Sequence, residues 1–291
     1  MFQGSYVALV TPMSEDGSLD EESLRALIDW HVEQGTDGIV AVGTTGESAT
    51  LGEKEHCYAI RRMVELTAGR LPVMAGTGAN STTEAINLTR CAKEAGADGA
   101  LLVTPYYNKP MQEGLYLHYK AVAEAVDLPQ MLYNVPSRTA CDMLPDTIGR
   151  LSAIPNIIGV KEATGDLHRV ALIRELCGGE FDIFSGDDAT SRELVLAGGQ
   201  GTISVTANIA PAAVSQMIVA ALAGDNRRAE EIDSKIAGLH RDLFLESSPI
   251  PVKWALWEMG RIPQGIRLPL TWFAEEHRNT LRNTMLQAGI L

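Results

Sequence analysis

The chain has few of the residues that bind metal ions or build disulfide frameworks. Its four cysteines are widely separated and form no CxxC pair, and its six histidines form neither an HExxH motif nor a cluster with acidic residues at ligand spacing. The pattern therefore predicts no metal site, and reduced cysteines that pack in the core. These cysteines are Cys57, Cys91, Cys141 and Cys177.

Long hydrophobic runs and an excess of basic residues are also missing. No apolar stretch approaches the about 18 residues of a membrane span, and residues 1–5 have neither the basic start nor the apolar segment of a signal peptide. The 24 Lys and Arg residues are outnumbered by 37 Asp and Glu, which gives a formal net charge of −13. We therefore expect a cytoplasmic protein that binds neither nucleic acid nor anionic membranes. An acidic substrate would require local positive charge in the site.

The length of 291 residues and the order of the predicted elements indicate an α/β fold, a (β/α)8 TIM barrel with a C-terminal helical extension. After Pro211 the strand signals end and the chain reads as helices. We expect a catalytic barrel over residues 1–224 and a helical region over 225–291 that packs on it. The eight predicted strands are residues 6–10, 38–42, 72–75, 100–103, 130–133, 157–160, 182–184 and 202–205.

Several helix starts are readable between these strands. Asp20 precedes two glutamates and is expected to cap the first helix. The segments 50–53 and 81–84 each place a hydroxyl residue three positions before a glutamate, which is the capping-box pattern.

Lys161 is a charged residue at the end of an apolar run, residues 157–160. Full burial lowers the pKa of a lysine by roughly 3–5 units, which makes the neutral amine a nucleophile near neutral pH. The other six lysines lie in segments that read as polar helix faces or loops. On position alone, Lys161 could instead extend to solvent or pair with Glu162. Barrel active sites lie where strands end, which favours the nucleophile.

The segment GTTGE at residues 43–47 follows the second predicted strand. Its glycines permit a tight turn, and its two hydroxyls and backbone N–H groups can face a small anion such as a carboxylate. An ordinary turn is the alternative. A phosphate is disfavoured, because barrel phosphate sites use the loops after strands 7 and 8.

Tyrosines at strand ends are informative in a chain with only 5% aromatic residues. Tyr133 and Tyr107 could relay protons through Thr44, or could simply pack at the rim. Arg138 could hold a substrate carboxylate, or form a surface ion pair. The segment 185–188 after the seventh strand could contact substrate, or cap the next helix.

Three segments together resemble the pyruvate-dependent class I aldolase family over essentially the whole chain: residues 43–47, 133–139 and 159–166. The branch that they resemble condenses pyruvate with L-aspartate 4-semialdehyde, the first committed step of lysine and diaminopimelate biosynthesis. The resemblance implies that Lys161 forms an imine with pyruvate, so that covalent catalysis requires no metal or other cofactor. It also implies a homotetramer built from two tight dimers.

The same resemblance implies a role for each matching residue. Tyr133 would donate and accept protons, linked by Thr44 to Tyr107 of a neighbouring subunit. Thr45 would hold the pyruvate carboxylate, and Arg138 the carboxylate of the semialdehyde. The rest of the site would be lined by Gly186, Asp187 and the backbone of Ile203.

Two alternatives remain at this point. An N-acetylneuraminate lyase or another sugar-acid aldolase shares the barrel and the lysine, but the sialic-acid branch resembles this chain without Arg138. A noncatalytic barrel that senses keto acids is disfavoured by the intact Lys161, Tyr133 and Thr44.

The resemblance further implies feedback inhibition by L-lysine at a pocket in the tight-dimer interface. Glu53 stands where some lysine-sensitive relatives carry histidine, so inhibition could be weaker here; a capping role also explains it. The residues that match the allosteric pocket are Ser48, Ala49, His56, Asn80, Glu84 and Tyr106.

Overall fold

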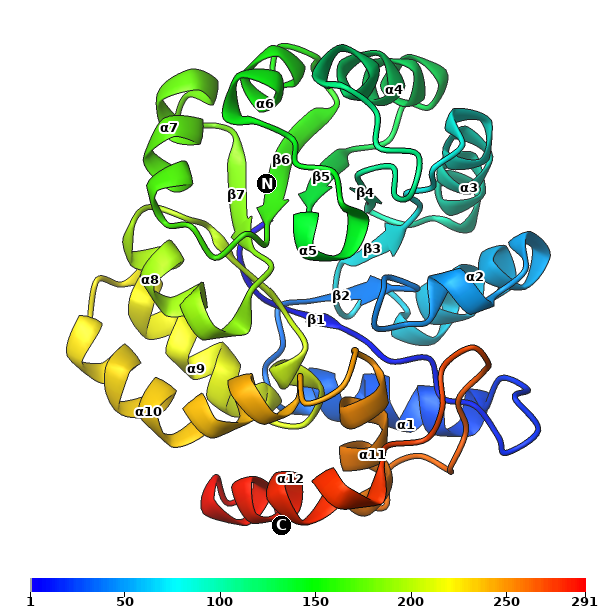
Figure 1. Cartoon of the computed structure of the whole chain (residues 1–291), viewed down its shortest axis with the longest axis vertical. Helices are drawn as coiled ribbons and strands as arrows, with labels where there is room; N and C mark the ends of the chain where they lie inside the picture. Colours follow the sequence, from blue (N-terminus) through cyan, green and yellow to red (C-terminus); the bar gives the residue numbers. More distant parts are fainter. Residues whose placement is uncertain (1) are drawn as a thin grey trace.

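The computed structural model describes residues 2–291, and within them eight parallel strands form a closed barrel (Figure 1). Each strand pairs with the next along the chain, and β1 pairs with β8 to close the sheet. All eight predicted strands are present, so the predicted fold class is confirmed. The strands are β1 Gly4–Ala8, β2 Gly38–Ala41, β3 Val73–Gly76, β4 Gly99–Val103, β5 Gln130–Asn134, β6 Ile157–Glu162, β7 Asp182–Ser185 and β8 Gly201–Ser204.

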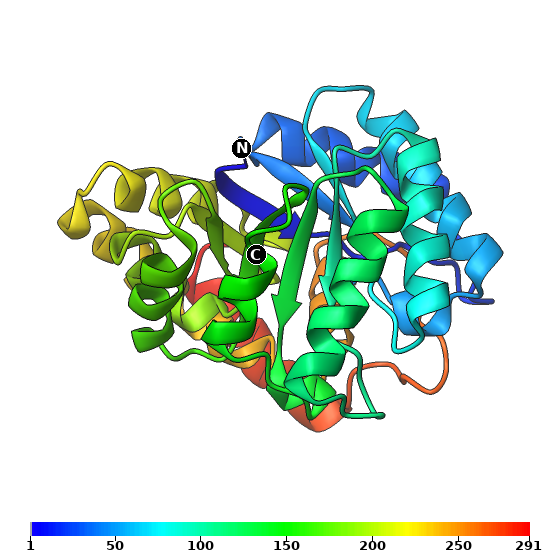
Figure 2. The ribbon, with the colours of Figure 1, turned by 90° about the horizontal axis from the view of Figure 1, so that it is seen from above.

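Helices surround the strands (Figure 2), and α10 packs on α9 and on the final helix, α12. The predicted division at residue 224 falls between α9 and α10 and stays a prediction. The helices are α1 Glu21–Glu33, α2 Glu53–Thr67, α3 Thr82–Ala95, α4 Gln112–Ala125, α5 Pro136–Thr139, α6 Pro145–Leu151, α7 His168–Cys177, α8 Ser191–Leu196, α9 Pro211–Leu222, α10 Asn226–Asp242, α11 Ile250–Glu258 and α12 Glu275–Gln287. Short 3-10 turns are η1 Ser48–Thr50, η2 Asp188–Thr190 and η3 Thr206–Asn208.

The apolar side chains form two clusters, as a barrel requires, because alternate residues of a strand face opposite sides of the sheet. The larger cluster lies between the strands and the helices. The smaller one fills the barrel interior and includes Tyr6, Met74, Met131 and Phe184. The barrel is therefore filled below the level where its strands end.

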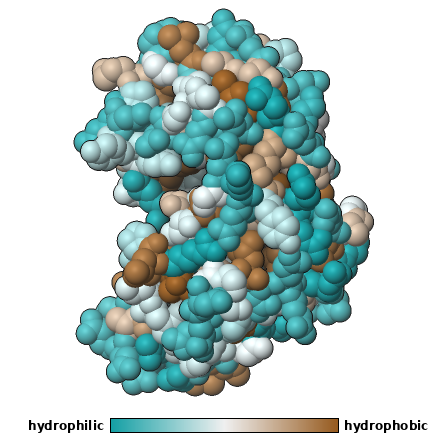
Figure 3. Space-filling model, turned by 90° about the vertical axis from the view of Figure 1, so that its right-hand side faces the viewer, coloured by the Kyte–Doolittle hydropathy of each residue, from teal (hydrophilic) through white to brown (hydrophobic). Residues whose placement is uncertain are grey.

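The outer side formed mainly by α2, α3 and α4 is largely hydrophilic, with separate hydrophobic patches (Figure 3).

A helix begins at or directly after each of the three predicted starts, but only two of the three predicted caps are present. The carboxylate of Asp20 accepts hydrogen bonds from backbone N–H groups in the first turn of α1, and Ser81 accepts one at the start of α3. The predicted capping box at residues 50–53 is wrong. Thr50 instead ends η1, and its hydroxyl donates to the backbone carbonyl of Glu47.

The prediction of four reduced cysteines is also wrong. A disulfide joins Cys57 of α2 to Cys91 of α3, with their Cα atoms 5.9 Å apart, whereas Cys141 and Cys177 are free. Sequence spacing gave no sign of this pair, because two neighbouring helices bring the cysteines together.

No group of three or more His, Cys, Asp or Glu within residues 2–291 is arranged to hold a metal ion. Over the same residues, no helix has the length and apolar character needed to cross a membrane.

Lys253 corrects the prediction that the lysines other than Lys161 all lie on polar helix faces or in loops. Its side chain, on α11, is fully enclosed and forms an ion pair with Glu47, whose side chain is also fully enclosed. The sequence around Lys253 reads as a helix face, and its acidic partner lies 206 positions away. No local pattern could have identified the pair.

Candidate active site

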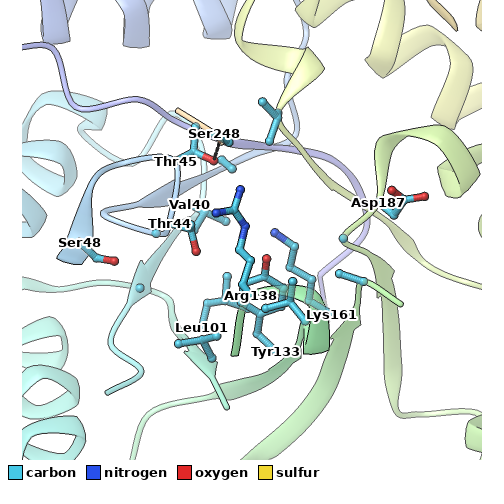
Figure 4. A pocket seen from close by; sticks show the side chains of 18 of the residues that line it. Val40, Thr44, Thr45, Ser48, Leu101, Tyr133, Arg138, Lys161, Asp187 and Ser248 are labelled. Atoms are coloured by element: carbon cyan, nitrogen blue, oxygen red, sulfur yellow. Dashed lines mark hydrogen bonds between the residues drawn. The ribbon is translucent and has the colours of Figure 1, made fainter. Parts of the chain in front are cut away.

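A cavity of about 590 Å³ opens at the carboxyl ends of the strands (Figure 4). Each of the eight strands, or the segment directly after it, contributes to its wall, as expected for a barrel enzyme. The polar residues of the wall are Thr44, Thr45, Ser48, Tyr133, Ser137, Arg138, Lys161, Asp187, Glu246, Ser247 and Ser248.

Lys161 lies in β6 and is only 5% exposed. Its register partner on β5 is Tyr133, and its amine nitrogen lies 4.3 Å from the centroid of the tyrosine ring. Glu162, the next residue on β6, instead pairs with Arg169, with Nε and Oε2 3.0 Å apart. The alternative in which Lys161 pairs with Glu162 is therefore wrong.

Burial lowers the pKa of the Lys161 amine to about 7, with Asp188 opposing the shift and Arg138 adding to it. About half of the amine is therefore neutral near pH 7 and is able to attack a carbonyl carbon. In Figure 4 the amine and the Arg138 guanidinium point into the same space.

Gly186 follows β7 and makes room for this lysine. A Cβ atom at this position would lie 2.7 Å from Cε of Lys161 and 2.7 Å from Cβ of Ala163. Any larger residue would push the amine out of place, which gives Gly186 a steric reason to be glycine.

Tyr133 is buried, and burial raises its pKa to about 12, although Arg138 and a hydrogen bond with Thr44 act in the opposite direction. The phenol therefore keeps its proton at neutral pH and is able to donate it. Thr44 and Arg138 both line the cavity.

Ser248 is a cavity residue that sequence reasoning missed. Its hydroxyl lies 3.4 Å from that of Thr45, and it belongs to the segment 244–248, which lines the cavity between α10 and α11. The sequence around Ser248 reads only as part of the helical region over residues 225–291. No nearby motif marks it, because Thr45 lies 203 positions earlier.

Two predicted site residues lie away from the cavity wall. Ile203 is buried in β8 and packs in the barrel interior. Tyr107 is 89% exposed, and its backbone has a φ of 73°, in the left-handed region that residues other than glycine rarely adopt. Asp187 and Gly186 lie in the wall, as predicted.

A second cavity of about 240 Å³ shares part of its wall with the first, namely Thr44, Ser48, Gly78, Val103, Val135 and Arg138. Burial lowers the pKa of His56, whose Nε2 lies 2.8 Å from the backbone oxygen of Gly76. Asn80 does not line this cavity. The other predicted pocket residues do line it, namely Ser48, Ala49, His56, Glu84 and Tyr106, together with Glu53.

A (β/α)8 barrel with a buried, readily deprotonated lysine beside a tyrosine and an arginine has the site of a class I aldolase. The family model for the dihydrodipicolinate synthetase family matches residues 1–288, and the chain belongs to this family.

Related proteins match this chain over its whole length. The 4-hydroxy-tetrahydrodipicolinate synthase of Methylococcus capsulatus is 64% identical over 291 residues, which are 100% of both chains. The enzyme of the same name from Pseudomonas aeruginosa is 60% identical, also over 100% of both chains.

Solved structures show the same similarity. The chloride-inhibited dihydrodipicolinate synthase of Acinetobacter baumannii, complexed with pyruvate, superposes with a TM-score of 0.99 at 57% identity and covers 100% of both chains. The synthase of Cyanidioschyzon merolae with lysine bound gives 0.96 at 39% identity, covering 100% of this chain and 99% of that one.

These findings confirm the predicted family and the predicted enzyme class, a lyase. They support the predicted activity, that of a 4-hydroxy-tetrahydrodipicolinate synthase, over the sugar-acid aldolase alternative. The noncatalytic alternative is likewise not supported.

Proposed function

We propose that this chain condenses pyruvate with L-aspartate 4-semialdehyde through an imine on Lys161. The observation that carries the proposal is the buried Lys161 amine, which faces the cavity beside Tyr133 with its pKa lowered to about 7. The reaction is the first committed step of lysine and diaminopimelate biosynthesis. It needs no cofactor, because the side chain of Lys161 forms the covalent intermediate.

The first half-reaction begins with attack of the neutral Lys161 nitrogen on C2 of pyruvate. Loss of water leaves an iminium ion, and removal of a proton from the pyruvate methyl carbon gives an enamine. Thr45, which is buried at the cavity wall beside Ser248, holds the pyruvate carboxylate. Gly186 leaves space for the imine.

In the second half-reaction the enamine carbon attacks the aldehyde carbon of the semialdehyde, whose oxygen takes a proton. The amino group of the semialdehyde then attacks C2, which closes the ring and releases Lys161. Arg138 holds the second carboxylate by charge-assisted hydrogen bonds. Asp187, in the cavity wall, completes the surroundings of the bound intermediate, whereas the predicted contact with the backbone of Ile203 is not part of the proposal because Ile203 lies away from the wall.

Proton transfer is assigned to Tyr133, Thr44 and Tyr107. The hydrogen bond between Tyr133 and Thr44 supports the first link. Tyr107 is too exposed to act within its own subunit, and its exposure supports a role in the site of a neighbouring copy. The proposal therefore includes a homotetramer of two tight dimers, located in the cytoplasm.

L-lysine is proposed as an inhibitor that binds in the second cavity. Glu84 supplies a carboxylate for an ammonium group, while Ser48, His56 and Tyr106 supply polar contacts. Thr44 and Arg138 are among the residues that line both cavities, and they offer a direct route from this cavity to the catalytic one. The lysine-bound relative from C. merolae supports the ligand.

Borohydride reduction in the presence of pyruvate tests the proposal. We expect the protein to gain one reduced pyruvate on the peptide that contains Lys161, and a coupled assay with both substrates to show turnover. Lys161→Ala should lose the adduct. Lys120→Ala, which changes a lysine with a 42% exposed side chain, should keep it. An adduct that persists in Lys161→Ala would refute the assignment.

A further inference from the structure

We propose that Glu47 and Lys253 are a positioning pair that fixes the substrate loop, residues 43–47, against helix α11. The proposal rests on the function given above, because it concerns how Thr44 and Thr45 reach the substrate. Neither Glu47 nor Lys253 lines the catalytic cavity, so any effect on the reaction must pass through the residues that do.

Glu47 holds an unusual backbone conformation at the end of the loop. Its φ of 60° and ψ of 36° lie in the left-handed region, which costs energy for a residue with a side chain. Such a conformation persists only where the surroundings determine it. The buried side chain of Glu47 is therefore a candidate for what holds the turn.

The carboxylate of Glu47 is bound from three different parts of the chain. It forms the ion pair with Lys253 of α11, accepts a hydrogen bond from the backbone N–H of Arg267 at 3.2 Å, and accepts one from the Thr50 hydroxyl at 3.3 Å. One side chain thus ties the loop to the C-terminal helical region, to the segment around residue 267, and to η1.

The same turn sets the position of the substrate residues. The backbone N–H of Glu47 donates to the carbonyl of Thr44 at 3.1 Å. The carbonyl of Gly46 accepts from the Thr11 hydroxyl at 2.7 Å, and the Thr45 hydroxyl faces Ser248. A shift at Glu47 would therefore move Thr44 and Thr45 together.

Lys253 also fixes the opposite wall. It is the fourth residue of α11, and Ser248 lies just before this helix begins. The ion pair thus spans the two segments that meet where the Thr45 and Ser248 hydroxyls approach each other. Through this placement, the C-terminal helical region helps to set the geometry of a site at the strand ends of the barrel.

A buried ion pair contributes little net stability when both partners can be replaced by apolar groups, but its geometry is directional. This difference allows positioning to be separated from folding. The double variant Glu47→Gln/Lys253→Met removes both charges and retains the side-chain volumes, and the glutamine amide oxygen can still accept from the Arg267 N–H. Arg282→Met is the matched control, because it removes another ion pair of α11, to Glu258, away from the loop.

The test combines melting temperature, kcat/KM for each substrate, and amide hydrogen exchange over residues 43–48. In the double variant we expect a melting temperature within a few degrees of wild type, faster exchange in the loop, and a fall of about 10–100-fold in kcat/KM for pyruvate. Arg282→Met should change neither kcat/KM nor loop exchange.

Wild-type kcat/KM together with unchanged loop exchange in the double variant would overturn the proposal. If that variant does not fold, Glu47→Gln decides in its place, since it keeps the side-chain shape and weakens only the pair; it should lower kcat/KM for pyruvate and accelerate loop exchange. Failure of the proposed function can be told apart from failure of the positioning role. In the first case, the wild-type protein would not be trapped with pyruvate, whereas the exchange measurement tests the positioning role without depending on activity.

Discussion

The amine of Lys161 lies over the ring of Tyr133, its register partner on the neighbouring strand. Pairing of β5 with β6 places the two side chains on the inner face of the barrel at the same height. The proposed imine nitrogen and the proposed proton donor are thus placed by the sheet itself rather than by a flexible loop. Four predictions follow from this site and the cavity beside it.

The first prediction concerns the pH dependence of imine formation. Because the pKa of Lys161 is about 7, kcat/KM for pyruvate should rise about tenfold per pH unit below 7 and level off above it. Asp188 raises this pKa and Arg138 lowers it. Asp188→Asn should therefore move the profile to lower pH, and Arg138→Ala to higher pH. Borohydride trapping of the imine over a range of pH measures both shifts of the profile. Shifts in the same direction for the two variants would contradict the assignment of Lys161 as the nucleophile.

The second prediction concerns stability. The pKa of Lys161 is lowered from 10.5 to about 7, so the unfolded chain binds its proton more readily and the residue destabilises the fold at neutral pH. Lys161→Met should raise the free energy of unfolding at pH 7 by up to about 4 kcal/mol. The gain should be complete below pH 7 and should vanish as the pH rises toward 10.5.

Urea unfolding of both proteins at fixed concentration, at several pH values, checks this. Lys120→Met serves as the control, since its exposed side chain should give a small difference that does not change over this range. A difference for Lys161→Met that is independent of pH would count against a deprotonated, buried amine.

The third prediction separates the two substrates. Arg138→Ala should leave pyruvate trapping measurable at its own pH optimum, while kcat/KM for L-aspartate 4-semialdehyde falls by about 10²-fold, because a charge-assisted, bidentate contact with the second carboxylate is lost. Arg150→Ala is a matched control at an exposed ion pair with Glu113. Equal losses in both half-reactions would show that Arg138 does not serve mainly the second substrate.

The fold could be predicted because its signals are local. Each strand is a short β-rich run between turn residues. The apolar run before Lys161 indicates a buried strand end without any information about distant parts of the chain. The catalytic candidates were found for the same reason, since barrel topology alone places strand ends together.

The contacts that the sequence did not reveal join distant parts of the chain. Lys253 and Glu47 are 206 positions apart, Ser248 and Thr45 are 203 apart, and the disulfide closes a separation of 34. In each case the local pattern of one partner fits an ordinary surface helix or loop. Only the packing of the C-terminal helices on the barrel, or of α2 on α3, gives such residues their roles.

The fourth prediction concerns inhibition by L-lysine. Glu84 lines the second cavity but not the catalytic one. Burial raises the pKa of the Tyr106 phenol, and Glu84 lies close enough to add to this shift. Glu84→Gln keeps the size of the side chain and removes the charge that would pair with an ammonium group. The lysine concentration for half inhibition should therefore rise at least about tenfold, the loss expected for one charged hydrogen bond, while kcat without lysine stays unchanged.

Initial rates across a lysine titration, with calorimetry on the same samples, provide the measurement. Glu53→Gln is the matched control, because Glu53 lines the same cavity and is exposed like Glu84, but its charge acts on His56 rather than on Tyr106. Its effect should be clearly smaller than that of Glu84→Gln. Equal sensitivity to lysine in wild type and Glu84→Gln would exclude Glu84 as the partner of the ammonium group. Inhibition that weakens as pyruvate is raised would instead place lysine in the catalytic cavity, because a ligand of the second cavity reduces turnover without competing for Lys161.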